Sequence, residues 1–206
     1  HLNYHRAAEL LTRPRRSRNS PPLTDDTNDG QTFLVTDSVF SMDGDLADLN
    51  TLCALARTHQ SLVIIDEAHG TGVLGQHGRG LAELQGVEAD IAITIGTLSK
   101  AFGSVGGYVC GAQSVIETLV NAGRSFIYTT ALPPACSASS LAALQIIQSS
   151  DGKNRRDRVC ALAAKVRQEL TTLGFDCAQS QTPIVPVILG SSDRAMRASA
   201  LLEERG

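Results

Sequence analysis

The chain has 206 residues, of which 42% are hydrophobic, so it is long enough to bury a sizeable core. Its net charge of -3 and its 19% of charged residues are ordinary for a soluble protein and give no reason to expect a nucleic-acid partner. No apolar run approaches the ~18 residues that cross a membrane. The five cysteines are scattered without CxxC spacing, so they indicate neither a metal site nor disulfides. Cysteines without disulfides favour a location in the reducing cytoplasm.

The first predicted element is a helix over Arg6–Leu11, which begins without a capping residue. Because the chain also opens on His1 rather than methionine, we expect it to be a fragment of a longer protein. A polar loop is predicted over Arg13–Gly30, with a basic run at 13–18 and an acidic run at 25–30. No aromatic residues interleave with the basic run, so we interpret it as a solvated loop rather than a nucleic-acid patch.

Short apolar runs in the next part of the chain predict an α/β fold with a mainly parallel sheet. Each run is bounded by turn residues, and a helical pattern separates the first two. The predicted strands are Thr32–Thr36, Leu62–Asp66, Ile91–Ile95 and Gly106–Gly111, and the predicted helix is Ala47–Thr58.

The pattern changes to helices after Pro134, which predicts two domains, residues 1–134 and residues 135–206. The second domain would comprise a linking helix and a truncated α+β unit that begins near Asp151-Gly152. Its predicted elements are a helix over Ala135–Gln148, a helix over Asn154–Leu173, a strand over Thr182–Leu189, and a last helix N-capped by Asp193 and running to Gly206.

Lys100 and Asp66 each follow an apolar strand, and the carboxyl ends of parallel strands form the edge where α/β sheets bind ligands. An amine and a carboxylate at one such edge suit a pyridine cofactor that carries an aldehyde. The lysine forms an imine with the aldehyde, and the carboxylate keeps the ring nitrogen protonated. Hydroxyls of Thr97 and Ser99 lie beside the lysine in sequence and suit a phosphate group.

Plainer interpretations exist for each residue taken alone. A lysine after a strand is usually a solvated surface residue, and Asp66 could be a helix N-cap or an ion-pair partner. Ser41 precedes a turn signal and could satisfy local backbone groups. His69 could be a satisfied core histidine, although its place three residues after Asp66 in a glycine-rich turn favours a role in the site. The residues taken together are more specific evidence for a cofactor site than any one of them alone.

Five segments in one order resemble a known family, the α-oxoamine synthases, which are acyl-CoA-dependent enzymes of the fold-type I class that uses pyridoxal 5'-phosphate (PLP). The resemblance extends from Val35 to Pro134 and continues more weakly toward the C-terminus. The segments are Thr36–Asp45, Asp66–Gly75, Gly78–Gly80, Gly96–Gly103 and Arg124–Pro134.

The resemblance implies a role for each matching residue. Lys100 would bind the cofactor aldehyde and then act as the base that removes the substrate's α-proton. Asp66 would pair with the pyridine nitrogen, and His69 would lie near the cofactor's phenolic oxygen. The remaining matches imply that Ser41 contacts the cofactor, that Thr97 binds its phosphate, and that Thr129 and Thr130 reach the phosphate of the neighbouring subunit in a homodimer.

Within the family, the amino-acid sequences of Ser38–Phe40, Ala68–Gly75 and Arg124–Tyr128 favour the members that join L-alanine to a pimeloyl thioester in biotin synthesis. Members that use glycine are one alternative, and an aminotransferase is another. A third is a non-catalytic partner subunit, against which the presence of Lys100 argues. The resemblance also implies that a phosphate-binding loop and a carboxylate-binding arginine lie outside this sequence, so we expect the fragment alone to be inactive.

Overall fold

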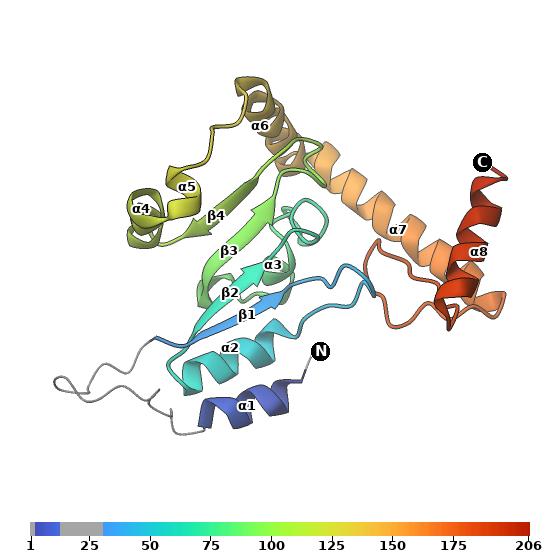
Figure 1. The fold of residues 1–206 in the computed structure, drawn as a ribbon, viewed down its shortest axis with the longest axis horizontal. Helices are drawn as coiled ribbons and strands as arrows, with labels where there is room; N and C mark the ends of the chain where they lie inside the picture. Colours follow the sequence, from blue (N-terminus) through green and yellow to red (C-terminus); the bar gives the residue numbers. More distant parts are fainter. Residues whose placement is uncertain (1–2, 13–30) are drawn as a thin grey trace.

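The computed structural model describes residues 3–12 and 31–206, so the loop predicted over Arg13–Gly30 lies outside the described residues. Within them, a four-stranded sheet has the order β1-β2-β3-β4 (Figure 1). Its strands are β1 (Phe33–Asp37), β2 (Leu62–Asp66), β3 (Ile91–Thr97) and β4 (Gly107–Gly111). The first three strands are parallel, and β4 runs antiparallel to β3. The prediction of an α/β fold with a mainly parallel sheet is confirmed.

One face of the sheet is covered by helices and holds the core. Val63 and Ile65 of β2 are almost fully buried there, as expected for a buried parallel strand. Helix α2 (Leu49–Thr58) packs against β2, and Asp48 caps it by accepting a hydrogen bond from the Thr51 amide at 3.0 Å. Helices α1 (Tyr4–Thr12) and α3 (Leu81–Gln85) pack in turn against α2.

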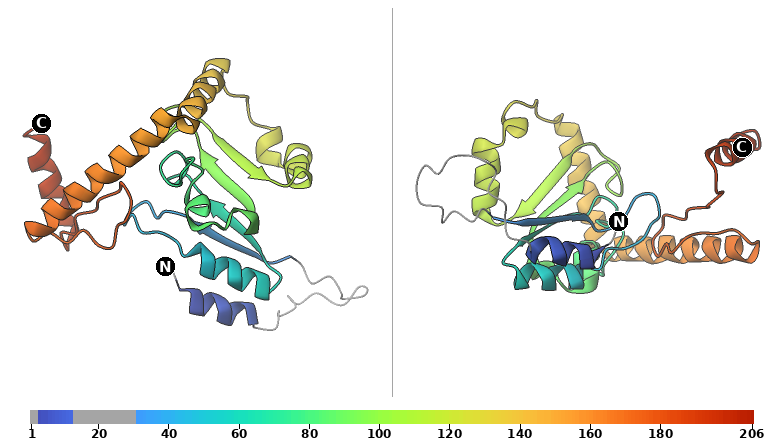
Figure 2. Two further views of the ribbon diagram at one scale, coloured as in Figure 1. Left: turned by 180° about the vertical axis from the view of Figure 1, so that it is seen from behind. Right: turned by 60° about the horizontal axis from the view of Figure 1, so that its bottom comes forward.

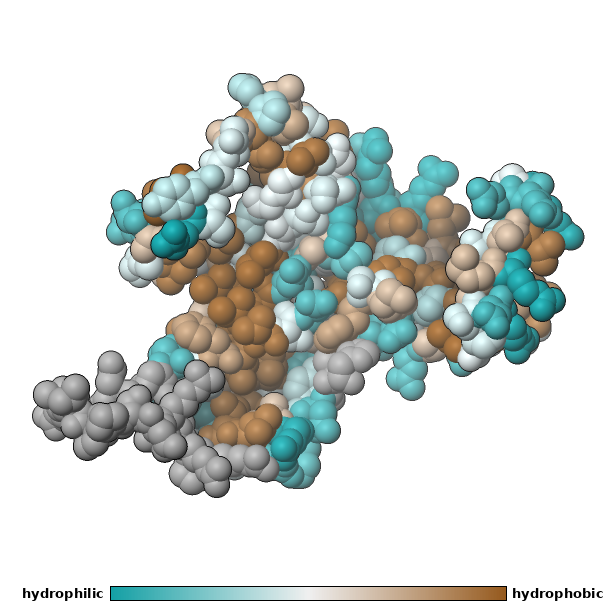
Figure 3. All heavy atoms as spheres, viewed as in Figure 1, coloured by the Kyte–Doolittle hydropathy of each residue, from teal (hydrophilic) through white to brown (hydrophobic). Residues whose placement is uncertain are grey.

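The opposite face of the sheet is largely open. Val35 lies at the centre of β1 and is 68% exposed, and Ile95 of β3 and Val109 of β4 are partly exposed on the same face. The space-filling view shows a continuous hydrophobic area over the strands (Figure 3). Because side chains alternate between faces, the carboxylates of Asp37 and Asp66 belong to this open face at the end of their strands.

Helices follow the sheet toward the C-terminus. Helix α4 (Gln113–Ala122) packs on β4 and leads into the short α5 (Arg124–Ile127). Helix α6 (Pro134–Gln148) packs against α7 (Ser150–Thr172), which projects away from the sheet toward α8 (Ser192–Glu203) (Figure 2). None of the helices in the described segments is both long and apolar enough to traverse a bilayer.

The predicted junction at Asp151-Gly152 lies inside a helix. Ser149 is the N-cap of α7 and accepts a hydrogen bond from the Gly152 amide at 3.2 Å, so Asp151 and Gly152 form the first turn. Only Ser149 separates α7 from α6. The division into residues 1–134 and 135–206 stays a prediction.

Two details of the C-terminal region were predicted wrongly. The segment Thr182–Leu189 forms no strand and makes a single antiparallel bridge between Ile188 and Asp176. Pro183 and Pro186 lack the amide protons that a ladder requires. Helix α8 is capped by Ser191, which accepts from the Arg194 amide at 3.4 Å, and not by Asp193, which lies in the first turn.

Candidate active site

The carboxyl ends of β1, β2 and β3 meet at one edge of the sheet. Asp37 and Asp66 are register partners at the ends of β1 and β2. One Asp66 carboxylate oxygen accepts a hydrogen bond from the Ala68 amide at 2.7 Å, which begins the turn that carries His69. Lys100 lies in the loop after β3, so the chain brings its amine to the same edge.

Lys100 and His69 are in direct contact. The Lys100 Nζ lies 2.7 Å from His69 Nε2, although 31 positions separate the residues. Burial, and then the positive charge of Lys100, lower the pKa of His69, while Asp37 and Asp66 oppose that shift. The imidazole is therefore favoured in its neutral form, in which Nε2 can accept a hydrogen bond from the lysine ammonium.

Two hydroxyls lie beside the lysine. Thr97 Oγ1 and Ser99 Oγ are 2.7 Å apart, and the Ser99 amide donates to Thr97 Oγ1 at 3.2 Å. Thr97 Oγ1 also lies 3.2 Å from the Gly106 carbonyl, to which it can donate. The strand end and the lysine loop thus hold two hydroxyl groups in fixed positions that could bind an anion.

The turn after His69 touches the lysine loop and β4. A Cβ on Gly72, whose φ is +80°, would lie only 2.7 Å from the Cβ of Ala101, so the two loops approach each other closely only because this residue is glycine. The Tyr108 hydroxyl donates to Thr71 Oγ1 at 2.8 Å. Gly96, the register partner of Tyr108, leaves the space that the tyrosine ring occupies.

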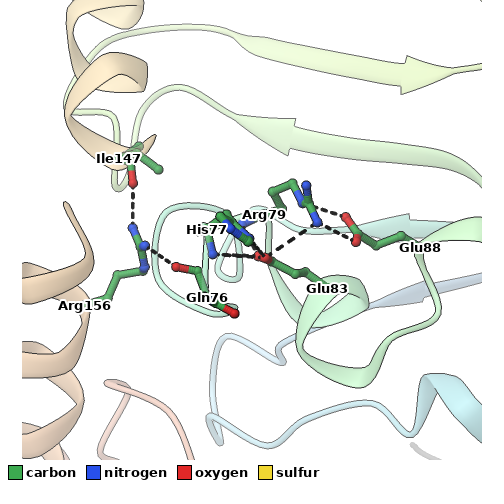
Figure 4. Close-up of polar contacts among 7 residues, drawn as sticks. All are labelled: Gln76, His77, Arg79, Glu83, Glu88, Ile147 and Arg156. Atoms are coloured by element: carbon green, nitrogen blue, oxygen red, sulfur yellow. Dashed lines mark hydrogen bonds and ion pairs between the residues drawn. The ribbon is translucent and has the colours of Figure 1, made fainter. Parts of the chain in front are cut away.

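The distal end of the same loop is held by Glu83 (Figure 4). The Glu83 carboxylate accepts from the amides of His77 and Arg79 at 3.0 and 2.9 Å and lies 2.6 Å from His77 Nδ1. Arg79 also pairs with Glu88 at 2.9 Å. Burial acts to raise the pKa of Glu83, but the hydrogen bonds from Arg79 and His77 and the charge of Arg79 together lower it, so the carboxylate is favoured as an ionised acceptor.

Arg156 ties this loop to the C-terminal helices. It is 6% exposed, and it donates to the Ile147 carbonyl at 2.8 Å and to the Gln76 carbonyl at 2.7 Å (Figure 4). Arg156 lies on α7, Ile147 is near the end of α6, and Gln76 belongs to the loop. A buried cation therefore joins three segments through backbone carbonyls.

The remaining predicted residues lie on the surface. Ser41 is exposed in a turn after β1, and Thr129 and Thr130 are exposed after α5. None of the three shares a hydrogen bond with Lys100 or His69 in the described part of the chain. Thr129 lines a groove of about 730 Å³ between the open face of β3 and β4 and the helices α4 and α5. The site as described thus consists of the residues at the sheet edge.

Sequence reasoning missed several residues of this region. Tyr108, Asp37 and Arg156 were not singled out; Tyr108 and Arg156 act through contacts with segments distant in sequence. Asp37 had a signal: it ends an apolar strand as Asp66 does. Arg156 had none, since its partner Gln76 lies 80 positions away.

Comparison with known proteins assigns the chain to a family. The family model described as aminotransferase class I and II matches residues 19–206. This chain belongs to the aminotransferase class I and II family. Curated relatives in this family include the 8-amino-7-oxononanoate synthases of Geobacter metallireducens, 50% identical over 177 residues, and Stutzerimonas stutzeri, 48% identical over 178 residues. Each alignment covers 86% of this chain and 45% of the relative.

Solved structures of similar fold include an enzyme with the same name as the curated relatives. Serine palmitoyltransferase from S. paucimobilis, with a bound PLP-myriocin aldimine, superposes with a TM-score of 0.87 and 29% identity over 99% of this chain and 50% of its own. The 8-amino-7-oxononanoate synthase of Francisella tularensis has a TM-score of 0.75 and 30% identity over 87% of this chain and 53% of its own. The chain spans about half the length of the proteins it matches.

The residues present fit PLP. The group requires an amine for its aldehyde, an acid for its ring nitrogen and donors for its phosphate. Lys100 could supply the amine, with His69 in contact at 2.7 Å, and Asp66 could supply a carboxylate at the same edge. The paired hydroxyls of Thr97 and Ser99 suit the phosphate. The set matches the chemical needs of this family's cofactor.

Proposed function

We propose that the protein containing this chain is a PLP-dependent acyltransferase, an 8-amino-7-oxononanoate synthase. It joins L-alanine to a pimeloyl thioester of coenzyme A or a carrier protein, and it releases the thiol and carbon dioxide in biotin biosynthesis. The observation that carries the proposal is the 2.7 Å contact between Lys100 Nζ and His69 Nε2, at the sheet edge that also bears Asp66. The relatives at 48 and 50% identity support the choice of substrate.

Lys100, Asp66 and His69 divide the chemistry between them. PLP supplies an aldehyde that takes up an amine and a pyridinium ring that accepts electrons. Asp66 keeps a proton on the ring nitrogen, because a nearby negative charge favours the protonated, positively charged form of the ring. Lys100 moves the α-proton of alanine as general base, and neutral His69 positions its amine.

Thr97, with Ser99 beside it, binds the phosphate in this proposal. Ser41 contacts the cofactor from the turn after β1. Thr129 and Thr130 act at the neighbouring subunit of a homodimer, which suits their exposed position after α5.

We place the protein in the cytoplasm, in keeping with cysteines that are all free, including exposed Cys110.

A second activity of the same class is condensation of glycine with an acetyl thioester, as in glycine C-acetyltransferase. A third is suggested by the likeness to serine palmitoyltransferase, at 29% identity. The 50% identity to an 8-amino-7-oxononanoate synthase ranks alanine above both. The amine, carboxylate and imidazole of this site do not by themselves distinguish the three activities, so the substrate assay decides among them.

The test uses the full-length protein. PLP is added, the visible absorbance band is followed, and borohydride is used to fix the cofactor before peptides are mapped by mass spectrometry. We expect the label on Lys100. Thiol release is then measured with alanine, glycine and serine against pimeloyl, acetyl and palmitoyl thioesters, and alanine with pimeloyl thioester should give the highest kcat/KM.

Two outcomes would overturn the proposal at different levels. Preference for glycine or serine would move the protein to another branch of the same chemistry. Absence of any PLP band would reject the whole class. The 206-residue chain is assayed in parallel, and we expect it to be inactive, because it spans about 45% of its relatives.

A further inference from the structure

Glu67 is a fully buried carboxylate next to the site. It follows Asp66, the last residue of β2, and its amide still pairs with the Ile95 carbonyl of β3, so its side chain continues the alternation and belongs to the face opposite Asp66. Asp66 serves the open face, whereas Glu67 is 0% exposed and continues the buried series of Val63 and Ile65. Burying a carboxylate costs free energy, so its partners show what it does.

The Glu67 side chain joins two other segments to the end of β2. Ser38 Oγ, just after β1, donates to Oε2 at 2.7 Å, and the Ala82 amide in α3 donates to Oε1 at 2.9 Å. Burial raises the pKa of Glu67, and these hydrogen bonds oppose that shift. The carboxyl group is thus a fixed acceptor between the first strand and the third helix.

The Glu67 backbone continues the same arrangement. Its amide donates to the Ile95 carbonyl of β3 at 2.7 Å, and its carbonyl accepts from the amides of Gly70 and Thr71 at 3.0 and 2.9 Å. These last two bonds close the turn that carries His69. One residue therefore connects β1, β3, α3 and the His69 turn.

Two glycines leave room for the carboxyl group. A Cβ on Gly70 would collide with Glu67 Oε2, and a Cβ on Gly80 would collide with the same carboxylate. Gly70 begins the loop after His69, and Gly80 ends it immediately before α3. The carboxyl group therefore fills the space between the two ends of the loop, and a shorter side chain would leave that space empty.

We propose that Glu67 is a positioning residue of the active site: through Ser38 and Ala82 it fixes the turn from Asp66 to Gly70, so that the Asp66 carboxylate and the His69 imidazole face Lys100. Glu67 does not touch the reacting atoms. The inference rests on the proposed function, because it assigns the purpose of the turn to holding residues around PLP. Contacts of this kind behind a site's ligands typically change activity by about 10- to 100-fold when they are removed.

The experiment compares Glu67→Asp with Glu67→Gln in the full-length protein. Aspartate keeps the charge but withdraws the carboxylate by one methylene, so it cannot reach Ser38 and Ala82 together. Glutamine keeps the length, and its amide can accept from Ala82 while the Ser38 hydroxyl rotates to accept from it. Glu83→Asp is the matched control, since Glu83 braces the distal half of the same loop without reaching His69.

Four quantities are measured: the pH midpoint of the PLP absorbance band, the Kd for PLP, the melting temperature, and kcat and KM for alanine. For Glu67→Asp we expect a shift of the absorbance midpoint of about 0.5 pH unit or more. We also expect a fall in kcat of about 10- to 100-fold, with a much smaller change in KM. Glu67→Gln should stay close to wild type, and Glu83→Asp should lower only the melting temperature.

Several results would reject the inference. A Glu67→Asp variant that only melts earlier, with wild-type absorbance and kcat, would leave Glu67 a purely structural role. Equal damage from Glu67→Gln would show that a side chain of the right length does not suffice, which would reject positioning through the two hydrogen bonds. If Glu67→Asp fails to fold, Ser38→Ala removes one of the two hydrogen bonds, and a wild-type absorbance midpoint in that variant would also reject it. Absence of the PLP band in wild type would reject the proposed function, and this inference with it.

Discussion

The two faces of the sheet differ in what their residues contribute. On the covered face, Ile65 is fully buried against helices and belongs to the core. On the open face, Val35 occupies a central position of β1 and is 68% exposed. The adjacent Asp66 and Glu67 repeat the contrast with carboxylates, one at the site and one in the interior. Stability is therefore concentrated on one face and the proposed chemistry on the other, and substitutions can separate the two.

The largest effect is expected from Lys100→Ala. Loss of the amine removes both the attachment of PLP and the proposed base, so kcat should fall by about 10⁴-fold or more. The melting temperature of the protein without PLP should stay near wild type, since Lys100 is exposed and lies outside the core. Lys153→Ala, an exposed change on α7, serves as the control for activity. Activity retained in Lys100→Ala would contradict the assignment.

Two alanine substitutions, one on each face of the sheet, test how much each face contributes to stability. Ile65→Ala should lower the free energy of unfolding by about 2–5 kcal/mol, because it leaves a cavity in the core. Val35→Ala should change it by about 0.5 kcal/mol or less in the 206-residue chain, because the side chain is already 68% exposed. Urea denaturation of both variants gives the comparison. Similar losses would mean that the open face is covered in solution.

The contrast between buried and exposed positions extends to helix α7, where Arg156 is buried. Arg156→Gln should lower the free energy of unfolding by about 2 kcal/mol, because it removes two hydrogen bonds donated by a buried cation. The neighbouring Arg155 is exposed and pairs with Asp151 at 2.9 Å. Arg155→Gln should therefore cost only about 0.5 kcal/mol. Equal losses measured by urea denaturation would remove the distinction between the two arginines.

The smallest effect concerns pH. The pKa of His69 is lowered from 6.5, so the unfolded chain takes up this proton before the folded chain does as pH falls. The contribution of His69 to stability is complete above about pH 6.5 and is lost as pH falls from there through the folded pKa. The His69→Gln variant should lose less stability as pH falls, because it lacks this contribution. Melting temperatures at about pH 7.5 and about pH 5.5 provide the check, and identical acid losses would contradict it.

Much of the fold could be predicted because local patterns determine it. The strand Leu62–Asp66 was predicted residue for residue, since an apolar run of that length forms a buried strand. Helix α3 was missed because its five residues are too few to show a period, and α4 because Ala112 precedes it without a capping side chain. The strand over Thr182–Leu189 was wrong because two prolines outweigh its apolar residues.

The site could be predicted only where it depends on strand ends. Asp66 and Lys100 were expected at one edge because parallel strands end together. Glu67 was quoted within a motif, but its role depends on Ser38 and Ala82, which lie 29 and 15 positions away. Tyr108 and Arg156 likewise depend on the packing of segments that sequence reasoning could not place. Sequence patterns thus indicated the reactive groups, while the residues that hold them required the structure.

The loop that carries Lys100 is closed on itself. The Leu98 amide donates to the Gly106 carbonyl, and the Ser104 amide donates to the Leu98 carbonyl, both at 2.8 Å. These bonds hold the backbone on either side of the lysine, and the four-carbon side chain of Lys100 lets its amine move without a shift of that backbone. Under the proposed function, the Lys100 amine can therefore leave His69 and return to it while the backbone of the loop stays in place.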